Sequence, residues 1–202
     1  MKIICIGRNY SDHAKEMNSP IPEEPLFFMK PDTALFRDTK LYYPEFTKEL
    51  HHEIELVVKI SKVGKHIALV NAHKYYDEIG LGIDFTARDI QKTCKEKGLP
   101  WEKAKAFDNS AVISQQFIAK DLLDLGNIHF SLSKNDATIQ IGNSADMIFS
   151  IDELISHISK FITLKTGDLI YTGTPEGVGL VKIGDKLTGF LNEKALFSIN
   201  IK

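Results

Sequence analysis

The sequence predicts an α+β fold in which a mixed, strongly curved β structure is covered by a few helices. Three observations indicate this class: strand-like segments outnumber helical ones, short turns join several of the strand-like segments, and residues 150–161 have the spacing of an amphipathic helix. The chain shows no internal repeat, no low-complexity segment and no long linker. We therefore expect residues 1–202 to form a single globular domain.

Strands are expected where apolar and polar residues alternate, or where a short apolar run lies between turn residues. Segment 52–60 is the clearest case, because apolar residues alternate there with Glu53 and Glu55. In the second half of the chain, a polar turn at 134–136 separates two strand-like segments. The predicted strands are 3–6, 26–29, 40–43, 52–60, 79–84, 128–132, 137–141, 169–172, 186–190 and 195–201.

Helices are expected over segments 9–17, 71–77, 86–97 and 150–161. A serine or an aspartate near the start of the first segment can cap it. Gly98 and Pro100 end the third helix, as glycine and proline commonly do. The last helix has apolar side chains near a spacing of 3.6 residues, at Ile151, Leu154, Ile155, Ile158 and Phe161. Prolines at 20, 22 and 25 predict a loop over 18–25.

The overall composition excludes several classes of protein. The chain has 25 basic and 27 acidic residues and no basic tract, so it lacks the charge pattern of a nucleic-acid-binding protein. Its two cysteines, Cys5 and Cys94, form no Cys-x-x-Cys pair, which favours a reducing, cytoplasmic location. No apolar stretch approaches the length of a membrane span, and the N-terminal residues do not have the pattern of a signal peptide.

Three acidic residues predict a metal site. Glu53 and Glu55 project from the same face of a strand, with their Cα atoms roughly 7 Å apart. Asp84 ends another apolar run and can complete the group. Oxygen ligands without cysteine favour a hard divalent ion such as Mg²⁺ or Mn²⁺. On a solvent-facing strand the same glutamates are only a hydrated surface, but the apolar flanks favour an enzyme site. His51 and His52 are expected to support the site rather than to bind the ion.

Two other pairs of residues have spacings that suit a functional site, but spacing alone does not distinguish such a site from an ordinary protein surface. His13 and Glu16 lie three residues apart on a predicted helix, so the carboxylate can orient the imidazole for proton transfer. Arg88 and Gln91 have the same spacing at the start of a helix that follows Asp84, where anions often bind. From spacing alone, His13 and Glu16 read as an ordinary surface pair. Arg88 can equally pair with neighbouring acids on the surface.

The remaining candidates carry less information individually. Spacing assigns no role to Lys105. Segment 173–179 contains three glycines after an apolar strand, which lets its backbone N–H groups approach a ligand closely. It is neither a phosphate-binding loop nor a dinucleotide fingerprint, so nucleotide binding is not indicated.

Taken together and in order, these motifs resemble the fumarylacetoacetate hydrolase family, in the short branch that includes acylpyruvases and oxaloacetate decarboxylases. The resemblance runs from Gly7 to about Gly189. The motifs that carry it are Ile6-Gly7-Arg8-Asn9-Tyr10 with His13, Phe28-Met29-Lys30-Pro31, His52-Glu53 with Glu55-Leu56, Asp84 with Thr86-Ala87-Arg88-Asp89 and Gln91, Lys105 with Phe107-Asp108, Asp146-Met147-Ile148-Phe149, and Gly173-Thr174-Pro175 with Gly177-Val178-Gly179.

The resemblance implies a fold and a set of residue roles. The fold is a mixed β-roll of the type found in the family's C-terminal domain, usually assembled as a homodimer. Glu53, Glu55 and Asp84 are expected to hold Mg²⁺ or Mn²⁺. His13 and Glu16 are implied to lie on a segment that orders over the site when substrate binds. The residues implied to be catalytic are His13, Glu16 and Lys105, and those implied to bind substrate are Arg8, Tyr10, Lys30, Arg88, Gln91 and Thr174.

The resemblance also implies a class of reaction. We expect a metal-dependent hydrolase that cleaves a C–C bond in acylpyruvate-type 2-oxo acids, with decarboxylation of oxaloacetate as a second activity that needs the same enolate. The alternatives are an isomerase of hydroxymuconate-type diacids and a ligand-binding relative without activity. The presence of His13, Glu16 and Lys105 beside the acids argues against the last, because binding alone does not need them.

Overall fold

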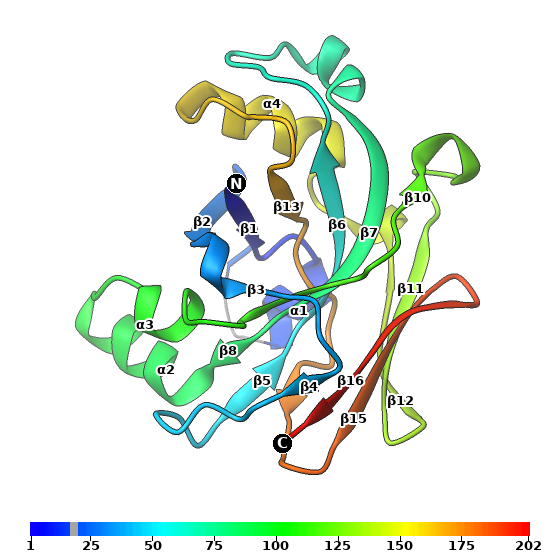
Figure 1. The fold of residues 1–202 in the computed structure, drawn as a ribbon. Coiled ribbons are helices and arrows are strands. Elements are labelled where there is room, and N and C mark those ends of the chain that lie inside the picture. The colour runs from blue at the N-terminus through cyan, green and yellow to red at the C-terminus, as the bar shows by residue number, and fades with distance from the viewer. Residues whose placement is uncertain (17–19) are drawn as a thin grey trace.

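The computed structural model describes residues 1–16 and 20–202, and it confirms the predicted α+β class (Figure 1). In Figure 1, α4 lies at the top of the view and α2 and α3 lie together at the lower left, whereas α1 lies near the centre. The predicted end of the first helix at Met17 and the start of the loop at Asn18 fall outside the described residues. Within the described residues, no helix is long and apolar enough to cross a membrane.

The largest sheet has eight strands and is mixed. Its order is β2-β1-β13-β6-β7-β9-β3, with β10 paired to β7. The pairs β1·β13 and β3·β9 are parallel and the others are antiparallel. Its strands are β1 (Ile3–Gly7), β2 (Leu26–Lys30), β3 (Leu35–Phe36), β6 (Ile54–Ile60), β7 (Tyr76–Asp84), β9 (Ala111–Ile113), β10 (Ile118–Ala119) and β13 (Leu169–Tyr171).

Two smaller sheets complete the β structure. The five-stranded sheet has the order β12-β11-β15-β16-β4, and the three-stranded sheet has the order β14-β5-β8. One apolar cluster spans the two larger sheets and includes Leu56 and Leu81 from the first and Leu132 and Ile199 from the second. The strands are β4 (Lys40–Leu41), β5 (Leu50–His52), β8 (Thr86–Ala87), β11 (His129–Lys134), β12 (Ala137–Asn143), β14 (Gly179–Leu180), β15 (Lys186–Leu191) and β16 (Lys194–Ile201).

The helices are short and begin and end where local chemistry requires. Ser150 and Glu153 form a capping box at the start of α4 (Ile151–Phe161), whose apolar face is buried. α2 (Arg88–Lys97) ends at Gly98, which takes the left-handed conformation with φ 63°. α2 packs against α3 (Glu102–Lys105). The other helices are α1 (Ser11–Glu16) and the 3₁₀ segments η1 (Asp32–Ala34), η2 (Leu69–Lys74), η3 (Lys120–Leu122) and η4 (Ser144–Asp146).

Three local predictions were wrong, and strand pairing explains two of them. The helix predicted over 71–77 is the 3₁₀ segment η2, because Tyr76 already pairs with Ile60 in the main sheet. The helix predicted from residue 86 begins at Arg88, because residues 86 and 87 form β8 beside β5. The strand predicted over 52–60 is two strands, β5 and β6, that belong to different sheets. The break between them is at Glu53.

Candidate metal centre and active site

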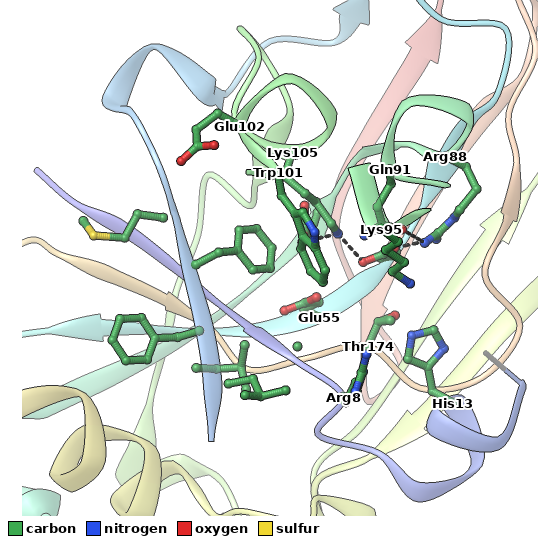
Figure 2. Close-up of a pocket in the computed structure, with 18 of the residues that line it drawn as sticks. Arg8, His13, Glu55, Arg88, Gln91, Lys95, Trp101, Glu102, Lys105 and Thr174 are labelled. Carbon is green, nitrogen blue, oxygen red and sulfur yellow. Dashed lines mark hydrogen bonds and ion pairs between the residues drawn. The ribbon is translucent and has the colours of Figure 1, made fainter. Parts of the chain in front are cut away.

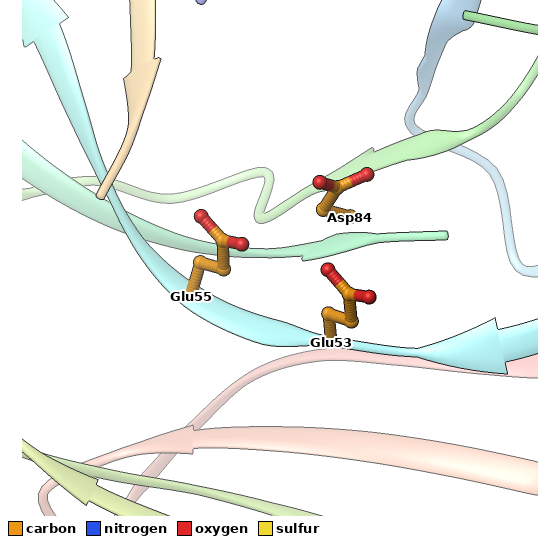
Figure 3. A group of neighbouring side chains, drawn as sticks. All are labelled: Glu53, Glu55 and Asp84. Carbon is orange, nitrogen blue, oxygen red and sulfur yellow. The ribbon is translucent and has the colours of Figure 1, made fainter. Parts of the chain in front are cut away.

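Glu53, Glu55 and Asp84 form one buried carboxylate group (Figure 3). Ile54 of β6 pairs with Ile83 of β7, so the two glutamates flank this pair and the aspartate follows it. One oxygen from each carboxylate lies within 4.8 Å of the others. The three residues are only 6%, 1% and 1% exposed. The predicted convergence of these side chains is therefore present in the fold.

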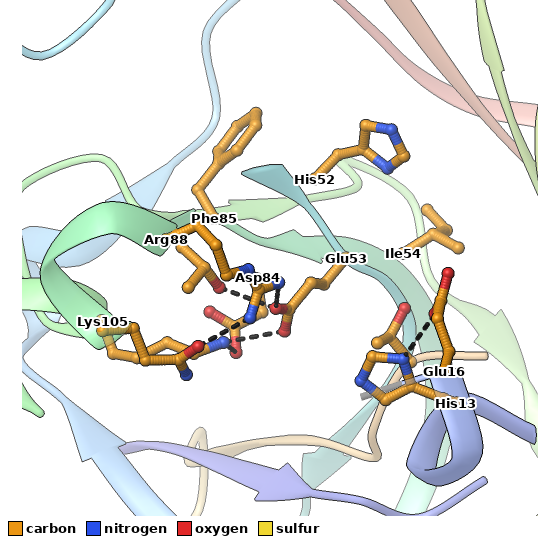
Figure 4. A network of polar contacts seen from close by, with 12 residues as sticks. His13, Glu16, His52, Glu53, Ile54, Asp84, Phe85, Arg88 and Lys105 are labelled. Carbon is orange, nitrogen blue, oxygen red and sulfur yellow. Dashed lines mark hydrogen bonds and ion pairs between the residues drawn. The ribbon is translucent and has the colours of Figure 1, made fainter. Parts of the chain in front are cut away.

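Three cationic side chains neutralise part of this acidic group, two of which, Lys105 and Arg88, are labelled in Figure 4. The Lys105 Nζ atom lies 2.7 Å from Glu53 Oε2 and 2.8 Å from Asp84 Oδ2. Arg88 Nη2 is 2.6 Å from the other Glu53 oxygen, Oε1. Lys30 Nζ is 2.7 Å from Asp84 Oδ1. Glu53 and Asp84 are thus paired at both oxygens, whereas the one hydrogen bond that Glu55 accepts from the described residues comes from the Gly173 backbone N–H, at 2.7 Å.

The electrostatics of the group distinguish Glu55 from Glu53. Burial raises the pKa of Glu53, but Lys105 and Arg88 outweigh this effect and hold the pKa below its usual value. Burial and the nearby charges of Asp84 and Glu53 raise the pKa of Glu55 well above its usual value, and the Gly173 hydrogen bond only partly offsets them. Among the described residues no cation forms an ion pair with Glu55.

This donor set fits a hard divalent cation. All three donors are carboxylates, they converge within coordination reach, and no described cation forms an ion pair with Glu55. Mg²⁺ and Mn²⁺ prefer such oxygen ligands, and in proteins they usually keep further positions for water or substrate. The group can therefore hold a metal ion with coordination positions left for a ligand.

The acidic group forms part of the wall of a cavity of about 710 Å³ (Figure 2). The cavity has an apolar side from β2 and the 100–101 segment, where Phe28 and Trp101 pack as a tilted ring pair. Six other predicted site residues line it: Arg8, His13, Arg88, Gln91, Lys105 and Thr174. They come from α1, α2, α3 and two loops, so the fold collects distant parts of the chain at one place.

His13 and Glu16 form the predicted contact on α1. His13 Nδ1 lies 3.1 Å from Glu16 Oε2, and His13 is 8% exposed. Glu16 also accepts a hydrogen bond from the Gly177 N–H at 3.2 Å, which fastens α1 to the glycine-containing segment. The carboxylate therefore holds the Nδ1 side of the ring, and the imidazole lines the cavity (Figure 2).

Two predicted substrate-binding residues lie outside the cavity lining. Lys30 is fully buried and contacts Asp84, the Ser110 hydroxyl and the backbone carbonyls of Phe85 and Ser110. Its partners indicate that it positions Asp84. Tyr10 is 3% exposed and packs edge-on against Phe130, with ring centroids 6.3 Å apart.

The glycine segment 173–179 approaches acidic side chains of the site. Gly173 donates to Glu55, and Gly177 donates to Glu16. Gly173 has φ 99°, and a Cβ atom there would lie 2.7 Å from the Asn9 Cβ. A side chain at residue 173 is therefore excluded by both backbone conformation and space. The backbone N–H groups of this segment thus contact two predicted site residues, and their approach to a ligand stays a prediction.

Gln140 is a buried site residue that the sequence analysis missed. Its Oε1 accepts a hydrogen bond from the Ile54 N–H and lies 2.8 Å from His52 Nδ1. Its Nε2 donates to Thr174 Oγ1 at 3.0 Å. Gln140 thus connects both neighbours of Glu53 to the wall of the cavity. The alternation of β12 places this amide on the inner face, which is the signal that could have identified it.

His52 has the supporting position that was predicted. It is 1% exposed, and burial lowers its pKa to about 4, so the imidazole is neutral at physiological pH. Its contact with Gln140 places it next to the carboxylate group without being among the three ligand candidates.

Comparison with known proteins identifies the family. The family described as "Fumarylacetoacetate (FAA) hydrolase C-terminal" matches residues 2–202. The chain is 45% identical over 189 residues to the oxaloacetate tautomerase YcgM of Escherichia coli (93% of this chain, 86% of the relative). It is 44% identical over 187 residues to the mitochondrial oxaloacetate tautomerase FAHD1 of Bos taurus (92% and 84%). It is 44% identical over 186 residues to a mitochondrial oxaloacetate decarboxylase of Dictyostelium discoideum (91% and 85%).

Solved structures give the same answer. A Yersinia pestis protein described as belonging to the fumarylacetoacetate hydrolase family superposes with a TM-score of 0.95 at 41% identity, covering 100% of this chain and 93% of that one. The fumarylpyruvate hydrolase of Pseudomonas aeruginosa, solved with Mn²⁺ and pyruvate, superposes with a TM-score of 0.93 at 36% identity, covering 100% and 89%. Both the fold and the family that the motifs resembled are confirmed. The chain therefore belongs to the fumarylacetoacetate hydrolase family of enzymes.

Proposed function

We propose that this protein uses Mg²⁺ or Mn²⁺ to form the enolate of a short 2-oxo acid, and that tautomerisation and decarboxylation of oxaloacetate are its main reactions. The observation that carries the proposal is the buried carboxylate group facing a cavity that also contains Lys105 and Arg88. The names of the relatives at 44–45% identity support oxaloacetate as the substrate. They put it ahead of the acylpyruvates that the motifs alone favoured.

When bound by Glu53, Glu55 and Asp84, the divalent ion would supply Lewis-acid stabilisation of negative charge on the 2-oxo acid. Arg88 offers a guanidinium group to the substrate carboxylate, and its hydrogen bond to Gln91 Oε1 at 2.6 Å fixes its orientation. Lys105 stays protonated, because Asp84 and Glu53 raise its pKa despite burial. Its ammonium group stabilises the developing enolate oxygen.

His13 is the proton carrier of this proposal. In tautomerisation, the C3–H electrons of the keto acid pass into the C2–C3 bond and the oxygen becomes an enolate, so a base must take the C3 proton and return it. His13 faces the cavity, and Glu16 holds its Nδ1 side, which leaves Nε2 for the transfer. In decarboxylation the electrons of the C3–C4 bond pass into the C2–C3 bond as carbon dioxide departs, which leaves the enolate of pyruvate, and that step needs no base.

Hydrolysis of an acylpyruvate is the second candidate, and the His13–Glu16 pair favours it. The same imidazole can take a proton from water as the water attacks the distal carbonyl. The C–C bond then breaks and leaves a pyruvate enolate, which Lys105 stabilises. The similarity to a fumarylpyruvate hydrolase supports this candidate. The homodimer and the cytoplasmic location remain predictions.

A substrate panel tests the proposal. The protein is treated with EDTA, reloaded with Mg²⁺ or Mn²⁺, and incubated separately with oxaloacetate and acetylpyruvate. Loss of the oxaloacetate enol absorbance and release of pyruvate, both dependent on the metal, are the expected results. Acetate released from acetylpyruvate without any effect on oxaloacetate would put hydrolysis first. No metal-dependent change in either substrate would overturn the proposal.

His13→Ala is expected to separate the reactions. Tautomerisation and hydrolysis should fall by roughly 10²- to 10⁴-fold, because both need the base, while decarboxylation changes by less than about tenfold. All three rates are measured on the same metal-loaded preparation. His129→Ala is the control, because His129 is exposed and lies in β11, away from the cavity lining. Equal loss of the three activities would contradict the role given to His13.

A further inference from the structure

Lys95 presents a positive charge to the cavity and forms no ion pair with the described residues (Figure 2). Arg88, Gln91 and Lys95 are three and four residues apart on α2, so they share one helix face, and that face lines the cavity. Lys95 is exposed at the rim, and Figure 2 shows its side chain directed toward Thr174 and His13. It therefore lies across the cavity from the apolar side formed by β2.

The charge of Lys95 is not used within the described part of the fold. Arg88 forms an ion pair with Glu53, whereas neither Lys95 nor Arg8 forms one with any described residue. The Lys95 ammonium group lies 5.7 Å from the centre of the Trp101 ring. Burial and the nearby charges of Arg88 and Arg8 lower the pKa of Lys95, while the charge of Glu53 raises it, so Lys95 is close to two other cations of the cavity. Such a cluster attracts an anion.

The charges of the cavity also match a substrate with two carboxylates. Four cationic side chains line it (Arg8, Arg88, Lys95 and Lys105), and four acidic ones do so as well (Glu53, Glu55, Asp84 and Glu102). A divalent ion on the acidic group would therefore leave a surplus of positive charge. Arg88 and Lys105 form ion pairs with the acidic group, whereas Arg8 and Lys95 form none with the residues that the structure describes.

We propose that Lys95, assisted by Arg8, binds the second carboxylate of a dicarboxylic 2-oxo acid and so makes the enzyme prefer dicarboxylic over monocarboxylic substrates. This inference rests on the proposed function. Lys95 determines specificity in this proposal, because it binds the carboxylate at the end of the substrate that is distant from the 2-oxo group. The reaction itself still depends on His13, Lys105 and the acidic group.

The test compares oxaloacetate with its 4-ethyl ester, which keeps the 2-oxo carboxylate but lacks the second charge. Tautomerisation of both is followed by the enol absorbance. In Lys95→Met, kcat/KM for oxaloacetate should fall roughly 10- to 100-fold and that for the ester less than about threefold, since only the dianion loses a charged hydrogen bond. Lys95→Arg should retain the preference. Lys92→Met, an exposed change on the same helix, is the control and should leave both values unchanged.

Trp101 provides a binding readout that does not depend on turnover. It is the only tryptophan of the chain and lines the cavity beside Lys95. Metal-loaded protein is titrated with 2-oxoglutarate and with 2-oxovalerate, which differ only in the second carboxylate. The unchanged protein should bind 2-oxoglutarate more tightly, and Lys95→Met should lose that difference.

The outcomes separate the two levels of the proposal. If the unchanged protein acts on neither oxaloacetate nor the ester, the proposed function fails. If it acts on both, and Lys95→Met lowers kcat/KM for oxaloacetate and for the ester by the same factor, the role of Lys95 is refuted and the proposed function stands. The same conclusion follows if the substitution changes neither of the two binding titrations.

Discussion

Replacing Glu55 by Gln is expected to remove metal-dependent turnover and, at the same time, to stabilise the metal-free protein. The loss of activity should be roughly 10²- to 10³-fold or more, because one of three charged ligands becomes a neutral amide. The gain in stability has a separate cause. Glu55 is buried beside Asp84 and Glu53 without a cationic partner, so its ionised form is repelled in the fold. A glutamine of the same shape removes that repulsion and can still accept the hydrogen bond from Gly173.

The sign of the effect makes it measurable against pH. The pKa of Glu55 is raised above its usual value of 4.5, so ionisation of Glu55 destabilises the fold at any pH above that value. The melting temperatures of the EDTA-treated proteins should therefore be similar near about pH 4.5 and diverge in favour of Glu55→Gln as the pH rises toward neutrality. Adding Mn²⁺ should raise the melting temperature of the unchanged protein but not that of the variant.

Glu78→Gln is the matched control. Glu78 lies on β7, the neighbouring strand, but is half exposed and pairs with Lys59 at 2.7 Å. This change should leave both the activity and the effect of Mn²⁺ intact. If Glu55→Gln lowers the stability of the metal-free protein at neutral pH, the repulsion inferred for the carboxylate group is absent.

The sequence was sufficient to predict the acidic group, because strand alternation is a local property. Glu53 and Glu55 share a face at any register, and Asp84 follows an apolar run that can pair beside them. The cations around the group could not be predicted in the same way. Lys30 and Lys105 reach Asp84 from β2 and α3, and their contacts depend on packing between distant segments.

The strand break at Glu53 also depends on the tertiary structure. The alternating pattern continues through the break, so periodicity predicted one long strand. In the fold, β5 pairs with β8 and β14 while β6 pairs with β7 and β13, and the Gln140 side chain contacts His52 at the end of β5 and Ile54 at the start of β6.

Lys95, in contrast, could have been identified from the sequence. Its spacing from Arg88 and Gln91 was available in the sequence and indicates the same helix face.

Replacing Lys105 by Met is expected to weaken both the metal-free fold and catalysis while leaving metal binding intact. The ammonium group contacts Glu53 and Asp84 in an environment that is only 3% exposed. Removing one partner of a buried ion pair costs about 3–5 kcal/mol, so the EDTA-treated variant should melt at a much lower temperature. The methionine side chain suits the remaining space, because the Lys105 Nζ atom lies 5.1 Å from the centre of the Phe28 ring and a thioether packs well against an aromatic ring.

A bound metal ion should reverse most of that loss, because it supplies positive charge to the same two carboxylates. The rise in melting temperature on adding Mn²⁺ is therefore expected to be larger in Lys105→Met than in the unchanged protein, and the Kd for Mn²⁺ equal or lower. Turnover of oxaloacetate by the metal-loaded variant should still fall by roughly 10²- to 10³-fold, because the group that stabilises the enolate is gone.

Lys103→Met is the control for this experiment, since Lys103 is exposed on the same short helix. It should change neither stability nor turnover. If metal binding and activity disappear together in Lys105→Met, Lys105 acts by holding Glu53 and Asp84 in place. If metal binding is retained and activity is lost, its ammonium group acts on the substrate, because the carboxylates then remain able to bind the ion without it.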